Sequence, residues 1–190
     1  MSIPARPKIF HIVHVDRLPA IIASNGLLSD ARINQNTVDS GTTIGLSSIK
    51  LRRLQQNMLS SYPDLYVGQC VPFYFCPRSI MLFMIHCAND DQLTYRGGQP
   101  EIVHLQADLY ESVQWAQEHQ RRWVFTLSNA GSAFFEDRND LSQLNELNWA
   151  AINARDWRLS KDGKQSEFLM EESFPWHLIE EIGVQSRTVK

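Results

Sequence analysis

The sequence predicts a mixed α+β fold built from short strands. Apolar, β-branched and aromatic runs recur as strand candidates, and amphipathic or polar stretches separate them irregularly. The chain has no GxGxxG after a strand and no GxxxxGK[ST], so it lacks the usual phosphate-binding loops of doubly wound sheets. With 190 residues, 43% of them hydrophobic, we expect one domain over residues 1–190 with a sizeable core.

The N-terminal region predicts a strand, a short helix and a loop. Residues 8–15, KIFHIVHV, are dense in apolar and β-branched side chains and indicate a strand. Asp16 is expected to cap a helix that ends near Ser24, where Asn-Gly follows. The polar composition of residues 29–43 favours a loop.

The next region predicts an amphipathic helix and a strand. Residues 47–59 carry apolar side chains at helical spacing among basic and Gln side chains. Residues 71–75, VPFYF, favour a strand, and Pro72 suggests that it lies at a strand start or on a sheet edge. The apolar run IMLFMIHCA that follows is too short to cross a membrane and indicates core.

The second half of the chain predicts further strands around one helix. Residues 108–120 form a helical pattern that Asp108 is expected to cap. From 128 to 163 the signals become short and aromatic. The strand candidates are EIVHLQ (101–106), RWVFTL (122–127), EFLMEE (167–172) and EEIGVQS (180–186).

Charge and cysteine content narrow the class of protein. The net charge of −3 argues against a nucleic-acid binder, yet residues 40–89 contain four basic residues and one acid, which gives that segment +3 and leaves −6 elsewhere. Such a basic region suits an anionic ligand, unless it is chance clustering. Three cysteines, Cys70, Cys76 and Cys87, together with an opening that lacks a signal-peptide pattern, predict reduced thiols and a cytoplasmic protein.

A glutamate and two histidines lie on predicted strands, where a polar side chain needs a partner or a function. Glu167 stands directly before an apolar pair where burial is expected, and a buried carboxylate has either a partner or a chemical task. His11 and His14 are three positions apart on a strand, so they point to opposite faces and do not share a metal. Either one can be a satisfied core histidine, and no further ligands suggest a metal site.

Arginine and aromatic side chains leave two interpretations open. Arg52 and Arg53 lie on the predicted amphipathic helix, either on a solvated face or with one guanidinium bound to a phosphate. Adjacent helical positions are about 100° apart, so at most one points into a site. In VPFYF, Tyr74 faces away from its two Phe neighbours, and the triplet is either a core strand or a stacking platform for a planar ring.

Taken in order, four blocks resemble the DarT family of DNA ADP-ribosyltransferase toxins. The opening FHIVHVDRLPAIIASNGLL is similar to that family's first block, and IGLSSIKLRRLQ resembles its Ile-Lys-x-Arg-Arg segment. VPFYFCPRSIMLFMIH, the most specific block, resembles Val-Pro-Phe-Tyr-Phe-x-x-Arg-Ser-Pro-Met-Leu-Tyr. QSEFLMEESFPWHLIEEIGV resembles the ending Ala-Glu-Phe-Leu-Val … Pro-Trp, so the resemblance covers nearly the whole chain.

The resemblance implies an ADP-ribosyltransferase-like fold, with a split, bent β-core, surrounding helices and NAD in the cleft. It implies transfer of ADP-ribose from NAD, without a metal, to a base of single-stranded DNA, with thymidine favoured and guanosine possible. The implied partner is a DarG-like macrodomain antitoxin. The implied catalytic residues are Glu167 and Arg53, and the implied cofactor-binding residues are His11, His14, Tyr74, Arg52, Gly26 and Leu27. The implied DNA-binding residues are Arg78, Met81 and Met84.

The chain departs from the family pattern at three positions. Ile80 replaces Pro, Phe83 replaces Tyr, and Ser166 replaces the Ala that precedes the glutamate. Residues 128–163, expected to contact DNA together with the basic segment, match no family motif. Two other functions stay open: the same fold acting on RNA or protein, and an inactive NAD- or nucleic-acid-binding domain.

Overall fold

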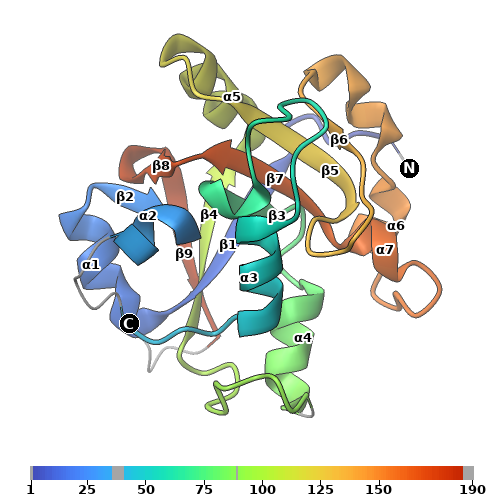
Figure 1. The fold of residues 1–190 in the computed structure, drawn as a ribbon. Helices are drawn as coiled ribbons and strands as arrows, with labels where there is room; N and C mark the ends of the chain where they lie inside the picture. Colours follow the sequence, from blue (N-terminus) through green and yellow to red (C-terminus); the bar gives the residue numbers. More distant parts are fainter. Residues whose placement is uncertain (1, 36–40, 89, 186–190) are drawn as a thin grey trace.

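The computed structural model describes residues 2–35, 41–88 and 90–185, and its centre is a seven-stranded antiparallel sheet. The strand order is β6-β5-β7-β3-β1-β4-β9, and a small second sheet pairs β2 with β8 (Figure 1). The seven strands are β1 (Lys8–His14), β3 (Cys70–Tyr74), β4 (Ile102–Asp108), β5 (Trp123–Asn129), β6 (Asp137–Arg138), β7 (Ser166–Glu171) and β9 (Ile179–Val184). The pair is β2 (Gly26–Leu28) and β8 (Ser173–Pro175).

Helices surround the sheet, with α5 at one end of the molecule and α4 at the other (Figure 1). They are α1 (Leu18–Ala23), α2 (Asp30–Gln35), α3 (Ser47–Gln55), α4 (Ile80–Cys87), α5 (Leu109–Glu118), α6 (Trp149–Asn153) and α7 (Lys161–Lys164). The described parts of the chain also contain four 3₁₀ helices: η1 (Val15–Arg17), η2 (Val67–Gln69), η3 (Leu141–Glu146) and η4 (Trp176–Leu178). This α+β architecture confirms the predicted fold class.

Caps explain where the helices begin. The Asp108 carboxylate accepts hydrogen bonds from the backbone amides of Tyr110 and Glu111, so it caps α5 as the sequence predicts. Ser79 caps α4 in the same way. Asp16, however, does not cap a helix, because its carboxylate accepts from Thr42 instead and α1 begins two residues later without a side-chain cap.

Two further expectations need correction. Residues 29–43 are not all loop, because the Ser29 hydroxyl accepts from the Arg32 amide and starts the short helix α2; residues 36–40 lie outside the described chain. The amphipathic helix ends at Gln55 rather than near residue 59. Asn57 turns the chain there, and its side-chain amide donates to two backbone carbonyls of the loop after β5.

Pro72 lies inside the sheet, not at a strand start or an edge. Strand β3 pairs with β7 over five positions, but its pairing with β1 is a single position, Phe10 with Tyr74. The Pro72 carbonyl points toward β1, and a residue's nitrogen and carbonyl point to the same side of a strand. The missing N–H therefore falls where the ladder is already open, and the sheet is split between β1 and β3.

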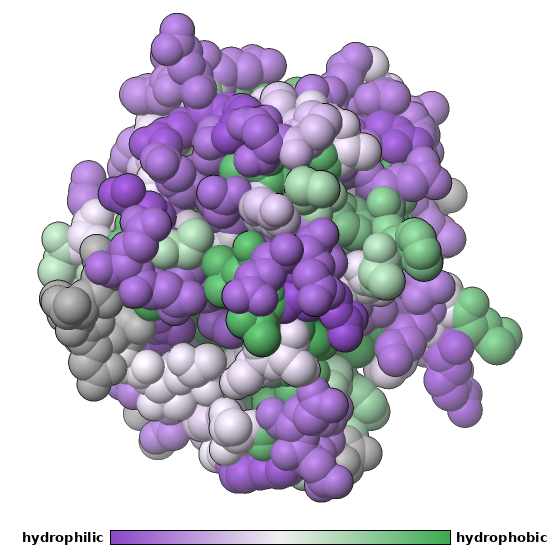
Figure 2. All heavy atoms as spheres, viewed as in Figure 1, coloured by the Kyte–Doolittle hydropathy of each residue, from purple (hydrophilic) through white to green (hydrophobic). Residues whose placement is uncertain are grey.

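The core fills both faces of this sheet. On one face Phe73, Phe125 and Phe168 pack in one cluster of buried side chains, and Val124 and Leu169, which alternate with them along β5 and β7, belong to a second cluster on the opposite face. The face of the molecule seen in Figure 2 is mostly hydrophilic, with apolar side chains exposed in a few places. Within the described residues, no helix has the length and apolarity needed to cross a membrane.

Candidate active site

Three neighbouring strands and helix α3 bring four of the predicted residues to one cavity. The cavity encloses about 210 Å³, and its lining includes His11 from β1, Tyr74 from β3, Glu167 from β7 and Arg53 from α3. Tyr74 and Glu167 are direct cross-strand partners. These side chains are far apart in the sequence, and the strand order β7-β3-β1 brings them together.

Glu167 has a partner, and the partner is Arg53. Arg53 Nη2 donates to Glu167 Oε2 at 2.7 Å, and Nη1 donates to Oε1 at 3.3 Å, which is a two-pronged pair. Glu167 is 2% exposed and the Arg53 side chain 13%. Burial alone would lower the pKa of Arg53, but the charge and hydrogen bonds of Glu167 outweigh it and raise the pKa. The guanidinium therefore stays charged beside the carboxylate.

A β-bulge fixes the backbone of Glu167. The register of β5 and β7 shifts between Phe125 and Asn129, so the regular ladder is interrupted beside Glu167. The buried Thr126 hydroxyl accepts from the Glu167 amide at 3.0 Å and donates to the Ser128 carbonyl at 2.7 Å. This replaces the missing ladder contact and holds the carboxylate at the cavity.

His11 is held as a neutral ring with a known tautomer. Its Nδ1 lies 2.7 Å from the Pro72 carbonyl, which only accepts, so Nδ1 carries the proton and Nε2 is left as an acceptor. Burial lowers the pKa of His11 to about 4. Burial, reinforced by the Glu167 carboxylate, raises the pKa of Tyr74, which keeps its hydroxyl protonated. The cavity thus offers a neutral acceptor and a neutral donor beside the ion pair.

The other predicted residues divide between the cavity and its surroundings. Leu27, Met81 and Met84 line the cavity, whereas His14, Arg52, Gly26 and Arg78 do not. His14 points to the other side of β1, where its ring nitrogens meet Asp16 and Glu101.

Local geometry explains the remaining three positions. Arg52, one position from Arg53 on α3, donates instead to the Gly131 carbonyl at 3.0 Å. At Gly26, where φ is +154°, an added Cβ would lie 2.3 Å from the Phe174 carbonyl oxygen, so a close backbone approach requires glycine there. Arg78 lines a separate groove on the far side of α4.

Several polar residues of the lining were not singled out as site residues from the sequence, among them Lys50, Asp30, Asn129 and Gln165. Lys50 and Asp30 form a 2.7 Å ion pair at the cavity. Lys50 precedes Arg53 by three positions, so helical spacing was a signal that it shares the same face. Asn129 and Gln165, joined by a hydrogen bond, depend on the bulge, and no local pattern marks them.

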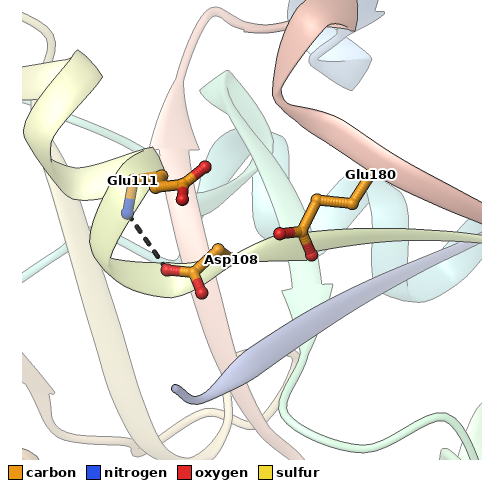
Figure 3. A group of neighbouring side chains, drawn as sticks. All are labelled: Asp108, Glu111 and Glu180. Carbon is orange, nitrogen blue, oxygen red and sulfur yellow. Dashed lines mark hydrogen bonds between the residues drawn. The ribbon is translucent and has the colours of Figure 1, made fainter. Parts of the chain in front are cut away.

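Among the residues that the structure describes, one carboxylate cluster has metal-like spacing, and it lies outside the cavity. Asp108, Glu111 and Glu180 approach one another at the junction of β4, α5 and β9 (Figure 3). Arg6 and Lys8 already occupy the space among them, with ion pairs of 2.8–3.1 Å. Within the described residues, this cluster is therefore a structural ion-pair network. The three cysteines are free thiols, as predicted.

Comparisons with known proteins agree with this geometry. A profile described as "ssDNA thymidine ADP-ribosyltransferase, DarT" matches residues 10–190. A DNA ADP-ribosyl transferase of Thermus aquaticus is 35% identical, covering 100% of this chain and 80% of its own length. One from Escherichia coli is 29% identical over 98% of this chain and 84% of its own.

Solved structures give the same match. The structure of Thermus sp. 2.9 DarT with ADP-ribosylated ssDNA superimposes with a TM-score of 0.85 at 32% identity, covering 100% of this chain and 86% of that one. The same protein with NAD⁺ gives 0.80 at 31% identity, covering 99% and 86%. A Thermosipho africanus DarTG structure with ADP-ribose, at 18% identity and a TM-score of 0.73, shares the fold.

Proposed function

Because the chain belongs to the DarT family of single-stranded-DNA thymidine ADP-ribosyltransferases, we propose that it transfers the ADP-ribose of NAD to thymidine in single-stranded DNA. The observation that carries the proposal is the buried Arg53–Glu167 pair, which lies in a cavity with the neutral His11 and Tyr74. Relatives solved with NAD⁺ and with ADP-ribosylated ssDNA support both substrates. Residues 1–190 act as one catalytic domain in this proposal.

The chemistry needs a fixed negative charge at the reacting sugar. When the bond from nicotinamide to ribose breaks, its electron pair leaves with nicotinamide and the sugar becomes oxocarbenium-like, as in glycoside cleavage. The Glu167 carboxylate stabilises that developing positive charge and can accept a hydrogen bond from a ribose hydroxyl. Glu167 needs no reorganisation to do this, because Thr126 and Arg53 already hold it.

The attacking nitrogen must lose a proton. Thymine has a single ring N–H once its other nitrogen is bonded to the sugar, and that proton leaves as the new bond to the ribose forms. Arg53, whose pKa is raised, serves in this scheme as a donor that orients the base and the carboxylate, and Glu167 serves as the proton acceptor.

The remaining side chains hold the two substrates. In this proposal His11 Nε2 accepts from a ribose hydroxyl of NAD, Tyr74 packs along the nicotinamide, and Leu27 adds apolar contact. Met81 and Met84, on the α4 side of the cavity, contact the DNA base.

The test is transfer of labelled ADP-ribose from NAD to matched single-stranded oligonucleotides whose only difference is the central base. Modification of the thymidine strand, with mass spectrometry locating the adduct on the base, is the expected outcome. Label on the guanosine strand, on RNA or on protein would redirect the assignment. No transfer to any acceptor, combined with measurable NAD binding, would indicate an inactive binding domain.

We also propose that the chain is the toxin of a toxin–antitoxin pair that acts in the cytoplasm. Family membership supports this role, and the free thiols suit a reducing compartment. The partner is a DarG-like macrodomain that removes ADP-ribose from DNA. Growth arrest on expression, relieved by co-expressing a macrodomain with intact hydrolase activity but not by an inactivated one, is the expected result.

A further inference from the structure

A second ion pair lines the active-site cavity and has no part in the chemistry proposed above. Lys50 on α3 donates from Nζ to the Asp30 carboxylate of the neighbouring helix α2 at 2.7 Å. Burial is the main cause of the low pKa of His11, and the charges of Asp30 and Lys50 act on the same ring, so the pair lies beside it. Gly45 leaves room for the lysine, because an added Cβ there would lie 3.0 Å from Lys50 Cε.

The two ion pairs of the cavity differ in how firmly they are held. The side chains of Arg53 and Glu167 are 13% and 3% exposed, and two hydrogen bonds join them. Those of Lys50 and Asp30 are 31% and 27% exposed, and one hydrogen bond joins them. A partly exposed ion pair contributes little to stability, so Lys50 can exchange its partner at small cost.

The cofactor brings a negative charge that the cavity must balance. NAD carries two negative charges on its diphosphate, and each of its riboses bears that diphosphate on the 5′ carbon. A ribose hydroxyl held by His11 therefore places the diphosphate next to the Lys50–Asp30 pair. Five charged side chains lie in the described lining, three cations and two carboxylates: Arg17, Lys50, Arg53, Asp30 and Glu167. Of the two carboxylates, Glu167 is used in the proposed transfer and Asp30 is not.

We infer that Asp30 takes the place of the NAD diphosphate in the free protein: it holds Lys50 at the cavity, and the diphosphate displaces it from Lys50 when NAD binds. This rests on the proposed function, because it assumes that NAD occupies the cavity. Lys50 then provides a point charge for the diphosphate, as lysine does in other phosphate sites. Asp30, released from Lys50, stays close to the diphosphate as a like charge. Lys50 therefore raises the affinity for NAD, and Asp30 lowers it.

The test is calorimetric titration of NAD and of ADP-ribose, which has the same diphosphate without the nicotinamide. Asp30→Asn keeps the shape and an oxygen acceptor but removes the competing charge. Both ligands should therefore bind about fivefold more tightly, the upper limit for a partly exposed ion pair. Lys50→Met should weaken the binding of both at least about tenfold, the loss expected for a hydrogen bond between charged groups. Lys50→Arg, which keeps the cation, should retain most of the affinity.

A double variant separates partner exchange from simple repulsion. If Asp30 acts through Lys50, the gain from Asp30→Asn should shrink in the Lys50→Met background. Arg32→Gln is the matched control, because Arg32 is an exposed cation on the same helix as Asp30 and does not line the cavity. Its affinities for both ligands should equal those of the wild type.

Three results would overturn the inference. The first is unchanged or weaker binding in Asp30→Asn, and the second is an equal gain from Asp30→Asn with and without the lysine. The third is a loss of affinity in Arg32→Gln as large as the loss in Lys50→Met.

The inference and the proposed function fail in different ways. Binding is measured without DNA, so a protein that binds NAD but modifies no acceptor refutes the proposed transfer, and the variants still decide the exchange. A wild type that binds neither NAD nor ADP-ribose refutes both.

Discussion

Glu167→Gln is the substitution that most directly tests the site. It removes the negative charge and keeps the shape, so Arg53 retains one oxygen acceptor and loses the second hydrogen bond and the opposing charge. A lost electrostatic contact of this kind costs about 2.7–4 kcal/mol in the transition state, which is a 10²–10³-fold lower kcat. NAD affinity should change far less, because His11, Tyr74 and Leu27 also hold the ribose and nicotinamide and Gln can still bond to a ribose hydroxyl.

Stability should fall as well, and the structure bounds the amount. A hydrogen bond to a charged group is worth about 1.5–3 kcal/mol, and removing one partner of a fully buried pair costs up to about 3–5 kcal/mol. Because Gln still accepts from Arg53, we expect the lower range. For a chain of this size that corresponds to a Tm lower by about 3–12 °C.

The matched control lies four residues along the same strand. Glu171 forms a comparable two-pronged pair with Arg122, with contacts of 2.6 and 3.1 Å, but it lies outside the cavity. Arg122 also pairs with Asp64, so Glu171→Gln should lower Tm by no more than Glu167→Gln does. Its rate of ADP-ribose transfer should be unchanged. Equal rate losses in the two variants, or less than a tenfold loss in Glu167→Gln, would refute the assigned role.

Three further outcomes are expected. Burial lowers the pKa of His11 in the folded protein to about 4, below its ordinary value of 6.5. The stability that the neutral ring contributes is therefore present above pH 6.5 and is lost as the pH falls toward 4. Across this range the Tm of His11→Gln should fall less steeply than the Tm of the wild type. Lys164→Met should lower Tm by several degrees, because the buried ammonium donates to one backbone carbonyl in the last turn of α6 and one just after it. Lys161→Met, at an exposed position, should leave Tm unchanged, and equal Tm values for the two variants would contradict this. ADP-ribose transfer to DNA should be suppressed when the complementary strand is annealed and should weaken as the salt concentration rises. The rate of transfer should fall more in Arg53→Ala than in Arg78→Ala. Equal reaction of duplex and single-stranded DNA would show that a single strand is not required.

Much of the fold was predictable because its strands are locally apolar and its caps are local. The strands around residues 8–15, 71–75 and 101–106 and the Asp108 cap follow from patterns within a few residues. The Asp16 cap was wrong because a distant residue, Thr42, takes its carboxylate. Patterns within a few residues of Asp16 cannot show that Thr42 binds its carboxylate in place of a helix amide.

The site was predictable where a single residue was unusual for its expected environment. A carboxylate placed before an apolar pair required a partner, and Arg53 is that partner. Which of the two adjacent arginines pairs with Glu167 depends on the rotation of α3, and the contact between Arg52 and the Gly131 carbonyl fixes that rotation. The bulge that recruits Thr126 and Asn129 is a tertiary feature, so sequence patterns could not place these two residues.

The split between β1 and β3 links the fold to the chemistry. A regular ladder of hydrogen bonds between β1 and β3 would give the Pro72 carbonyl a backbone donor. The His11 ring would then have no contact there that sets its tautomer. Because the ladder is open, the carbonyl accepts a hydrogen bond from His11 Nδ1–H, and the other ring nitrogen is left as an acceptor. Proline suits the position, since any other residue would bring an N–H into the gap without a partner. The interruption that weakens the sheet therefore sets the hydrogen-bonding character of the histidine at the cavity.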